Sequence, residues 1–163
     1  MITAVDSNVI LDALTADPKF GEISSLALTN ARRLGPLIVS EVVFSEVSGQ
    51  FPDTASAESY LTETGLTLKF SEPPGLHVAG RAWREYTRSR REAIICISCG
   101  HRNRPLCDNC KSRLRARQHV VADFLIGAHA LTRADRLLTR DRGYYTKYFP
   151  RLKILDPGVS SSR

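Results

Sequence analysis

Short apolar runs alternate with longer segments of helical periodicity along most of the chain. The runs are rich in leucine and β-branched residues and are bounded by glycine, proline or polar residues, which predicts strands. They cover residues 2–5, 37–39, 66–70, 137–138 and 152–155. The pattern therefore predicts a sheet of short strands joined by longer connections.

The connecting segments place apolar residues at the spacing of an amphipathic helix. Residues 22–34, for example, carry them at positions 23, 26, 27, 31 and 34, which share one helical face. Periodicity and capping residues together predict helices over residues 9–14, 22–34, 40–47, 55–64, from 73 onward, 112–131 and 144–149. Strands that alternate with helices indicate a three-layer α/β fold with a mostly parallel sheet.

Four acidic residues follow a predicted strand or lie within a predicted helix: Asp6, Glu46, Asp123 and Asp141. In open α/β sheets ligands bind outside the carboxyl ends of the strands, where Asp6 and Asp141 are expected. Asp123 lies inside the apolar run VVADFLIGAHAL, where a carboxylate is costly unless it reaches a cation or a donor. Converging carboxylates are typical ligands of Mg²⁺ or Mn²⁺. Taken singly, Asp6 and Asp141 are more typical of helix caps, and Glu46 of a surface residue.

Several other residues are given structural roles. Asp12 follows a short apolar pair in a predicted helix and is expected to face solvent. His129 is expected to be a packed histidine, and Trp83 and Tyr86 are expected in the core.

Length and composition limit the architecture. With 163 residues, of which 42% are hydrophobic, one compact domain with a small appendage is expected. No apolar run approaches the roughly 20 residues needed to cross a bilayer, and the first residues lack the basic region of a signal peptide. We therefore expect no membrane association and a cytoplasmic location.

The formal charge of +6 is concentrated in one central stretch. Residues 81–119 contain eleven basic and three acidic residues, whereas the rest of the chain contains twelve basic and fourteen acidic residues. A localised basic excess predicts a polyanionic partner, most commonly nucleic acid; the alternative is a solvated helix face. The candidate nucleic-acid-binding residues are Arg102, Arg104, Arg113, Arg115, Arg117, Arg140 and Arg142.

All four cysteines lie in the same stretch. Cys96, Cys99, Cys107 and Cys110 form two CxxC pairs separated by seven residues. Where no secretory signal is seen, this spacing predicts a structural Zn²⁺ bound by four thiolates better than it predicts disulfides. Gly100 after the first pair tolerates the positive φ that such a turn requires. The alternative is a set of reduced thiols or a redox pair.

The cysteine segment is too short to form a domain of its own, and it falls between two predicted helices. Residues 93–111 are therefore predicted to be a zinc-binding insertion. Residues 1–92 and 112–157 would form the α/β domain, and residues 158–163 a flexible tail.

Four motifs, in this order, resemble the pattern of PIN-domain ribonucleases. They are D-x-N at residues 6–8, S-x5-E at 40–46, ADFLIGAHAL at 122–131 and LLTRDRGY at 137–144. The resemblance covers nearly the whole chain except the cysteine segment. It implies a parallel sheet of four or five strands and hydrolysis of RNA with bound Mg²⁺ or Mn²⁺.

The same resemblance assigns roles to single residues. It implies that the catalytic metal ligands are Asp6, Glu46, Asp123 and Asp141. It also implies that Asn8 and Thr139 orient water and ligands beside them. Whether Glu46 binds a metal directly or positions the attacking water stays open, as does the choice between one and two metals.

Many small PIN-domain proteins are VapC-type toxins, which an antitoxin holds inactive and which are usually dimeric. Others process ribosomal or messenger RNA. The expected partners are therefore RNA, an antitoxin or a ribosomal precursor, and a second copy of the chain. The leading hypothesis is a metal-dependent endoribonuclease, although the cysteine insertion departs from the small toxin pattern. The alternative is a non-catalytic RNA- or ribosome-binding module with a zinc knuckle.

Overall fold

The computed structural model describes residues 1–88, 94–95, 101–112 and 121–158. Several residues predicted from the sequence to form sites lie outside this part of the chain: Cys96, Cys99, Arg113, Arg115 and Arg117. The side chains of Arg102 and Arg142 lie outside it as well.

Five short strands form one parallel sheet in the order β3-β2-β1-β6-β7. They are β1 (Thr3–Val5), β2 (Leu37–Val39), β3 (Leu66–Leu68), β6 (Arg136–Leu138) and β7 (Ile154–Leu155). Every pairing in this sheet is parallel, so all carboxyl ends lie along one edge. The predicted α/β fold is confirmed, although the third and last strands are shorter than their apolar runs.

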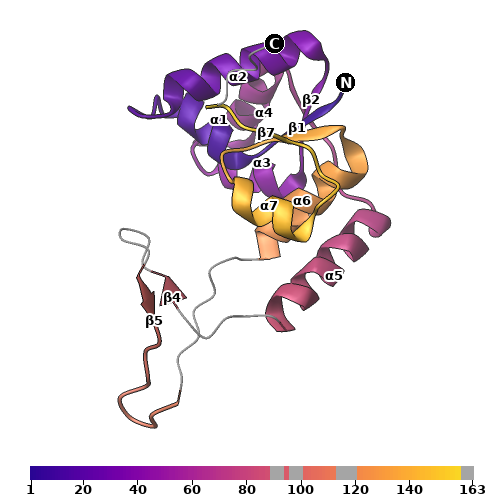
Figure 1. Cartoon of the computed structure of the whole chain (residues 1–163). Coiled ribbons are helices and arrows are strands. Elements are labelled where there is room, and N and C mark those ends of the chain that lie inside the picture. The colour runs from indigo at the N-terminus through magenta and orange to yellow at the C-terminus, as the bar shows by residue number, and fades with distance from the viewer. Residues whose placement is uncertain (89–93, 96–100, 113–120, 159–163) are drawn as a thin grey trace.

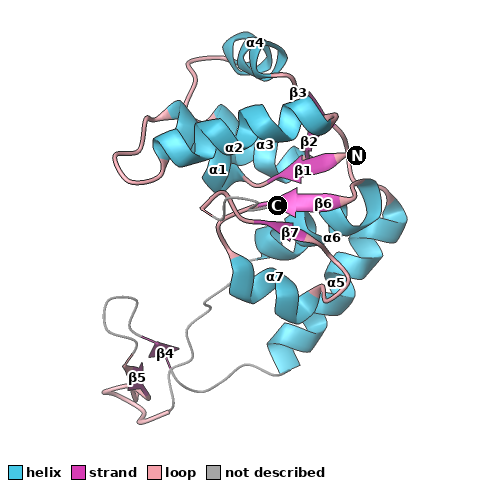
Figure 2. Ribbon diagram, turned by 45° about the horizontal axis from the view of Figure 1, so that its top comes forward, coloured by secondary structure: helices cyan, strands magenta, loops and turns pink. Residues whose placement is uncertain are grey.

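In the described residues, seven helices connect and cover the strands, and Figure 2 shows helices on both sides of the sheet. They are α1 (Ser7–Leu14), α2 (Gly21–Leu34), α3 (Glu41–Ser48), α4 (Thr54–Thr64), α5 (Pro73–Arg88), α6 (Val121–Arg133) and α7 (Arg142–Tyr148). Local hydrogen bonds and backbone geometry fix the ends of several helices. The Asp53 carboxylate caps α4 by accepting from the backbone N–H of Ser56 at 2.8 Å, and Gly65 ends that helix with φ of 73°.

The core is formed by the strands and by the inner faces of the helices. Residues of β1 and β2 are almost fully buried, as in other parallel sheets that are covered on both faces. Gly127 of α6 permits a close approach at one point, because a Cβ there would lie 2.4 Å from a ring carbon of Phe149. Tyr86 and His129 are buried and Trp83 packs against the core, which confirms their predicted structural roles.

A second, two-stranded antiparallel sheet lies apart from the main sheet (Figure 1). Its strands are β4 (Ile94–Ile95) and β5 (Arg102–Asn103). It falls within the residues predicted to form the insertion. In the described part of the chain, no helix has the length and apolar character needed to cross a membrane.

Candidate active site at the carboxyl edge of the sheet

Asp6 follows β1 directly and is the most buried of the four predicted acids, with 5% of its surface exposed. Because β1 and β6 pair in parallel with Val5 opposite Leu138, the residues that follow the two strands meet at the same edge. Three donors converge on Oδ2 of Asp6: Thr139 Oγ1 at 2.6 Å, Asn8 Nδ2 at 2.9 Å and the Tyr145 hydroxyl at 3.3 Å. The carboxylate is therefore fixed in one orientation.

The environment of Asp6 disfavours its negative charge. Burial raises the pKa of this carboxyl, and the negative charge of Glu46 raises it further. Hydrogen bonds from Thr139 and Tyr145 act in the opposite direction and favour the carboxylate. A bound cation would offset the same cost, so this local chemistry fits a metal site.

Two adjacent tyrosines of α7 lie among the predicted acids. Burial raises the pKa of Tyr145 far above its ordinary value, with additional contributions from the charges of Asp6, Asp123 and Asp141. Burial also raises the pKa of Tyr144, and Asp123 and Asp141 add to the effect. Three acids distant in sequence thus act on Tyr145, and two of them, Asp123 and Asp141, also act on Tyr144. All three therefore lie near α7.

The four carboxylates nevertheless do not form a compact ligand set. Within the described part of the chain, no three acidic, histidine or cysteine side chains come together closely enough to hold one metal ion. Glu46 and Asp141 are exposed. Asp141 caps α7 by accepting from the backbone N–H of Tyr144 at 3.2 Å, the role expected for a single acid at this position. Mutual repulsion of carboxylates gives a physical reason for their separation. The set consists of oxygen donors, which fit Mg²⁺ or Mn²⁺.

Asn8 and Thr139 link the ends of β1 and β6. Thr139 is fully buried; its hydroxyl donates to Asp6 and accepts from Asn8 Nδ2 at 3.2 Å and from the backbone N–H of Asp141 at 3.0 Å. The Asn8 side-chain oxygen Oδ1 accepts from the backbone N–H of Arg140 at 3.3 Å. This network connects Asp6 to the turn that carries Asp141.

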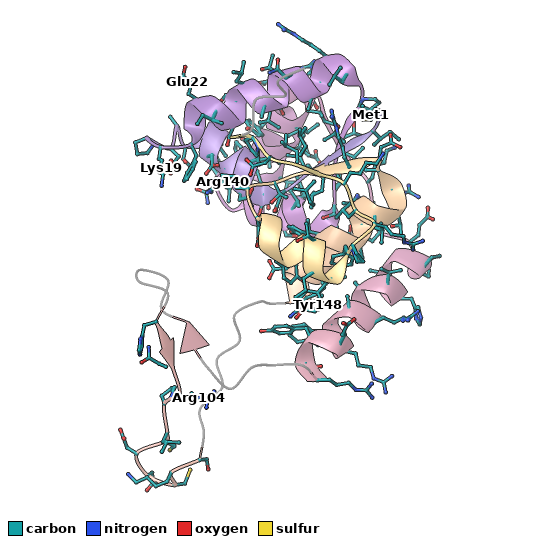
Figure 3. The ribbon with its side chains drawn as sticks, in the orientation of Figure 1. Met1, Lys19, Glu22, Arg104, Arg140 and Tyr148 are labelled. Atoms are coloured by element: carbon teal, nitrogen blue, oxygen red, sulfur yellow. The ribbon has the colours of Figure 1, made fainter. Side chains whose placement is uncertain are left out.

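Asp12 was expected to face solvent, and that expectation is wrong. It is 5% exposed and forms a two-point ion pair with Arg140, with Nη2 2.9 Å from Oδ1 and Nε 2.7 Å from Oδ2. Ser24 Oγ also donates to it at 2.9 Å, and the Arg140 guanidinium lies 4.2 Å from the centre of the Phe20 ring. Figure 3 shows Arg140 on the same side of the molecule as Lys19. The Arg140 guanidinium is therefore held by a structural partner.

Tyr145 is a site residue that the sequence analysis missed. Its hydroxyl reaches Asp6 only because α7 packs beside the end of β1, and the two residues are 139 positions apart. The only sequence signal is its spacing of four residues after Asp141, one helical turn.

The second cysteine pair has the geometry of a tight turn. The backbone N–H of Lys111 donates to the Cys107 carbonyl at 2.8 Å, and Lys111 has a φ of 58°. In the sequence, Lys111 directly follows Cys110 of the second pair, as Gly100 directly follows Cys99 of the first pair. Hydrogen bonds from Ser112 lower the pKa of the Cys110 thiol to about 7, with Cys110 Sγ and Ser112 Oγ 3.0 Å apart. A lowered thiol pKa favours the thiolate that a metal would bind.

Comparison with known proteins identifies the fold. No family model and no curated protein matches the chain. Among solved structures the chain is similar to VapBC2 from Rickettsia felis, which was solved bound to a DNA fragment from the VapBC2 promoter. The TM-score is 0.60 and the identity 17%, and the match covers 96% of this chain and 98% of the other. VapBC-1 from nontypeable Haemophilus influenzae gives the same TM-score and coverage at 15% identity. FitAB bound to an IR36 DNA fragment gives 0.56 and 14% identity over the full length of both chains. The chain therefore has a PIN-like fold.

Proposed function

We propose that the protein is a metal-dependent endoribonuclease that hydrolyses RNA phosphodiester bonds at the carboxyl edge of the sheet. The observation that carries this proposal is the buried Asp6 carboxylate, whose charge is disfavoured by burial and by Glu46. Asp123 and Asp141 act on the phenol of Tyr145, which donates a hydrogen bond to Asp6. Buried groups with perturbed pKa values at a strand edge are typical of functional sites.

The Mg²⁺ or Mn²⁺ would be held by the four acids Asp6, Glu46, Asp123 and Asp141. Such ions lower the pKa of a bound water and neutralise charge on the leaving oxygen. Thr139, Asn8 and Tyr145 keep the Asp6 carboxylate in one orientation by donating to its Oδ2 atom. The exposed Glu46 would either ligate a metal ion or orient the attacking water.

The proposal extends to partners. The similar solved structures are VapBC and FitAB assemblies, two of them on DNA fragments. We infer that this chain is a toxin-type nuclease of the cytoplasm, paired with an inhibitory antitoxin protein and able to form a homodimer. A role in RNA maturation is the second candidate, favoured by the cysteine segment and the basic stretch around it.

Cleavage of single-stranded RNA in the presence of Mn²⁺ tests the activity. Loss of an outer-shell partner costs about 10–100-fold in metal sites, so Asp6→Asn, which alters a direct ligand, should lose more than this. Asp53→Asn is the matched control, because asparagine caps a helix as well as aspartate. Equal cleavage by wild type and Asp6→Asn would contradict the assigned site. Cleavage by neither would favour the non-catalytic RNA-binding module.

We also propose that Cys96, Cys99, Cys107 and Cys110 bind one structural Zn²⁺. The turn at Lys111 and the lowered pKa of the Cys110 thiol support the second half of this site. Metal analysis of the purified protein should find about one zinc per chain, and Cys107→Ser should lose it. Asp108→Ala changes the same turn without removing a thiolate and should retain it. Four titratable thiols in the absence of zinc would instead indicate reduced cysteines.

A further inference from the structure

An open cavity of about 700 Å³ lies between α5 and the segment that follows α7. Four arginines line it: Arg81, Arg84, Arg88 and Arg151. We call this feature the arginine cleft. Glu85 is its one acidic lining residue, so the lining carries a net charge of +3.

The spacing of the arginines on α5 explains the concentration of charge. Arg81, Arg84 and Arg88 stand at positions i, i+3 and i+7, which lie on one face of a helix. The opposite face carries Ala79 and Tyr86, which are buried, and α5 packs along α6. Arg81 and Arg88 are therefore separated by about 10 Å along the helix axis. This distance is long enough for the arginines to contact more than one phosphate of a nucleic-acid backbone.

The cleft arginines differ from arginines with structural partners elsewhere in the protein. Arg133 forms an ion pair with Glu72, and Arg140 forms one with Asp12. Within the described residues, no ion pair involves an arginine of the cleft, and all four are exposed. Their guanidinium groups are therefore available to a polyanion.

The other wall of the cleft is aromatic and apolar, and it packs against α6, the helix that carries Asp123. Tyr148, Phe149 and Leu131 contribute to it. Tyr148, the last residue of α7, faces α5 (Figure 3), with its ring centre 6.0 Å from that of Tyr86 and 5.4 Å from that of Phe124. Phe124 directly follows Asp123 in α6, so the aromatic packing beside the cleft reaches the helix turn that carries a proposed metal ligand.

We propose that the arginine cleft binds the sugar-phosphate backbone of single-stranded RNA and leads it toward the acid site. Arginines along a groove with an adjacent aromatic ring are the combination by which proteins bind single strands without reading their sequence. The inference rests on the proposed function for its claim that the bound strand is the substrate. Binding itself does not require catalysis.

Fluorescence anisotropy with a labelled single-stranded RNA tests the proposal in the full-length Asp6→Asn protein, where cleavage does not interfere. In that background Arg81→Ala/Arg84→Ala/Arg88→Ala should bind at least about tenfold more weakly at low salt. Each lost phosphate contact lowers the slope of log affinity against log salt by about 0.7 for single strands, so the slope should fall by about 2. Because these side chains are exposed, the thermal unfolding midpoint should change little.

The matched control is Arg33→Ala, which removes an exposed arginine of α2 outside the cleft. It should leave the salt slope nearly unchanged. An unchanged affinity and slope in the triple variant would overturn the proposal. Arginine-dependent binding of poly-glutamate, together with arginine-independent binding of RNA, would also overturn it, in favour of an acidic protein partner.

Failure of this inference and failure of the proposed function can be told apart. If the wild type cleaves RNA and the triple variant binds RNA as well as before, the proposed role of the cleft is contradicted and the proposed nuclease activity is supported. Arginine-dependent RNA binding with no cleavage under any metal condition would support the cleft and contradict the nuclease.

Discussion

The acid site and the arginine cleft handle charge in opposite ways. At the acid site, the short side chain of Asp6 is buried and receives three hydrogen bonds at one oxygen. In the cleft, long arginine side chains stand in solvent without an ion-pair partner among the described residues. Hydrolysis needs groups held within a fraction of an ångström, whereas salt-dependent attraction to a phosphate chain tolerates mobile charge.

The difference also affects stability. Fixing a carboxylate in the interior costs desolvation, which the surrounding donors must offset. An exposed arginine carries almost no such cost. Substitutions at the acid site should therefore affect both folding and chemistry, and substitutions in the cleft should affect binding alone.

Arg140 and Arg84 give the sharpest test of this distinction. Arg140→Ala leaves Asp12 buried without its cation and should lower the free energy of unfolding by about 3 kcal/mol, the low end for a buried pair, because Arg140 is itself 33% exposed. Arg84→Ala should change it by less than about 0.5 kcal/mol. Urea unfolding measures both. Equal effects of the two substitutions would remove the distinction between fixed and free arginines.

Thr139→Val examines the fixed side of the comparison with a smaller change. It removes the 2.6 Å hydrogen bond to Asp6 and the acceptor for the backbone of Asp141. RNA cleavage should fall by about 10–100-fold, with RNA affinity unchanged. Thr29→Val, at an exposed position of α2, is the control. A loss of affinity with unaltered turnover would mean that Thr139 serves binding instead of chemistry.

His129 extends the comparison to a buried base, with the smallest expected effect. Burial lowers the pKa of His129, with a further lowering by Arg133 and an opposing effect of Glu41. The folded state thus keeps the ring neutral, whereas the unfolded chain takes up a proton near pH 6.5. The contribution of His129 to stability should be constant above about pH 6.5 and should decrease as the pH falls below it.

The His129→Gln variant should flatten this decrease, measured as unfolding midpoints between about pH 7 and pH 5. His77→Gln, at an exposed position of α5, should retain it. A decrease of equal slope in both variants would assign the acid sensitivity to other groups.

Much of the fold could be predicted from the sequence because buried strands and helices have characteristic local patterns of apolar residues. The apolar runs located all five strands of the main sheet, and the helical periodicity located the helices between them. The site was accessible in part: Asp6, Asn8 and Thr139 follow strands that pair, so a parallel sheet brings them together. The order of the strands had no local signal.

The errors share one cause. Asp12 was assigned to solvent because its neighbours in sequence are compatible with an exposed helix position, yet Arg140, 128 residues away, makes its burial tolerable. Tyr145 was missed for the same reason, since its partner Asp6 is 139 residues distant.

The sequence by itself determined the succession of strands and helices, the positions of the four acids after strands or within helices, and the helical spacing of three arginines on α5. Each of these depends on the identity and spacing of nearby residues. Only the tertiary structure decided that Arg140 pairs with Asp12, that Tyr145 reaches Asp6 and that Arg151 joins α5 across a cavity. Such contacts join residues far apart in the chain. They arise when helices pack on the sheet and therefore leave no pattern in any short stretch of sequence.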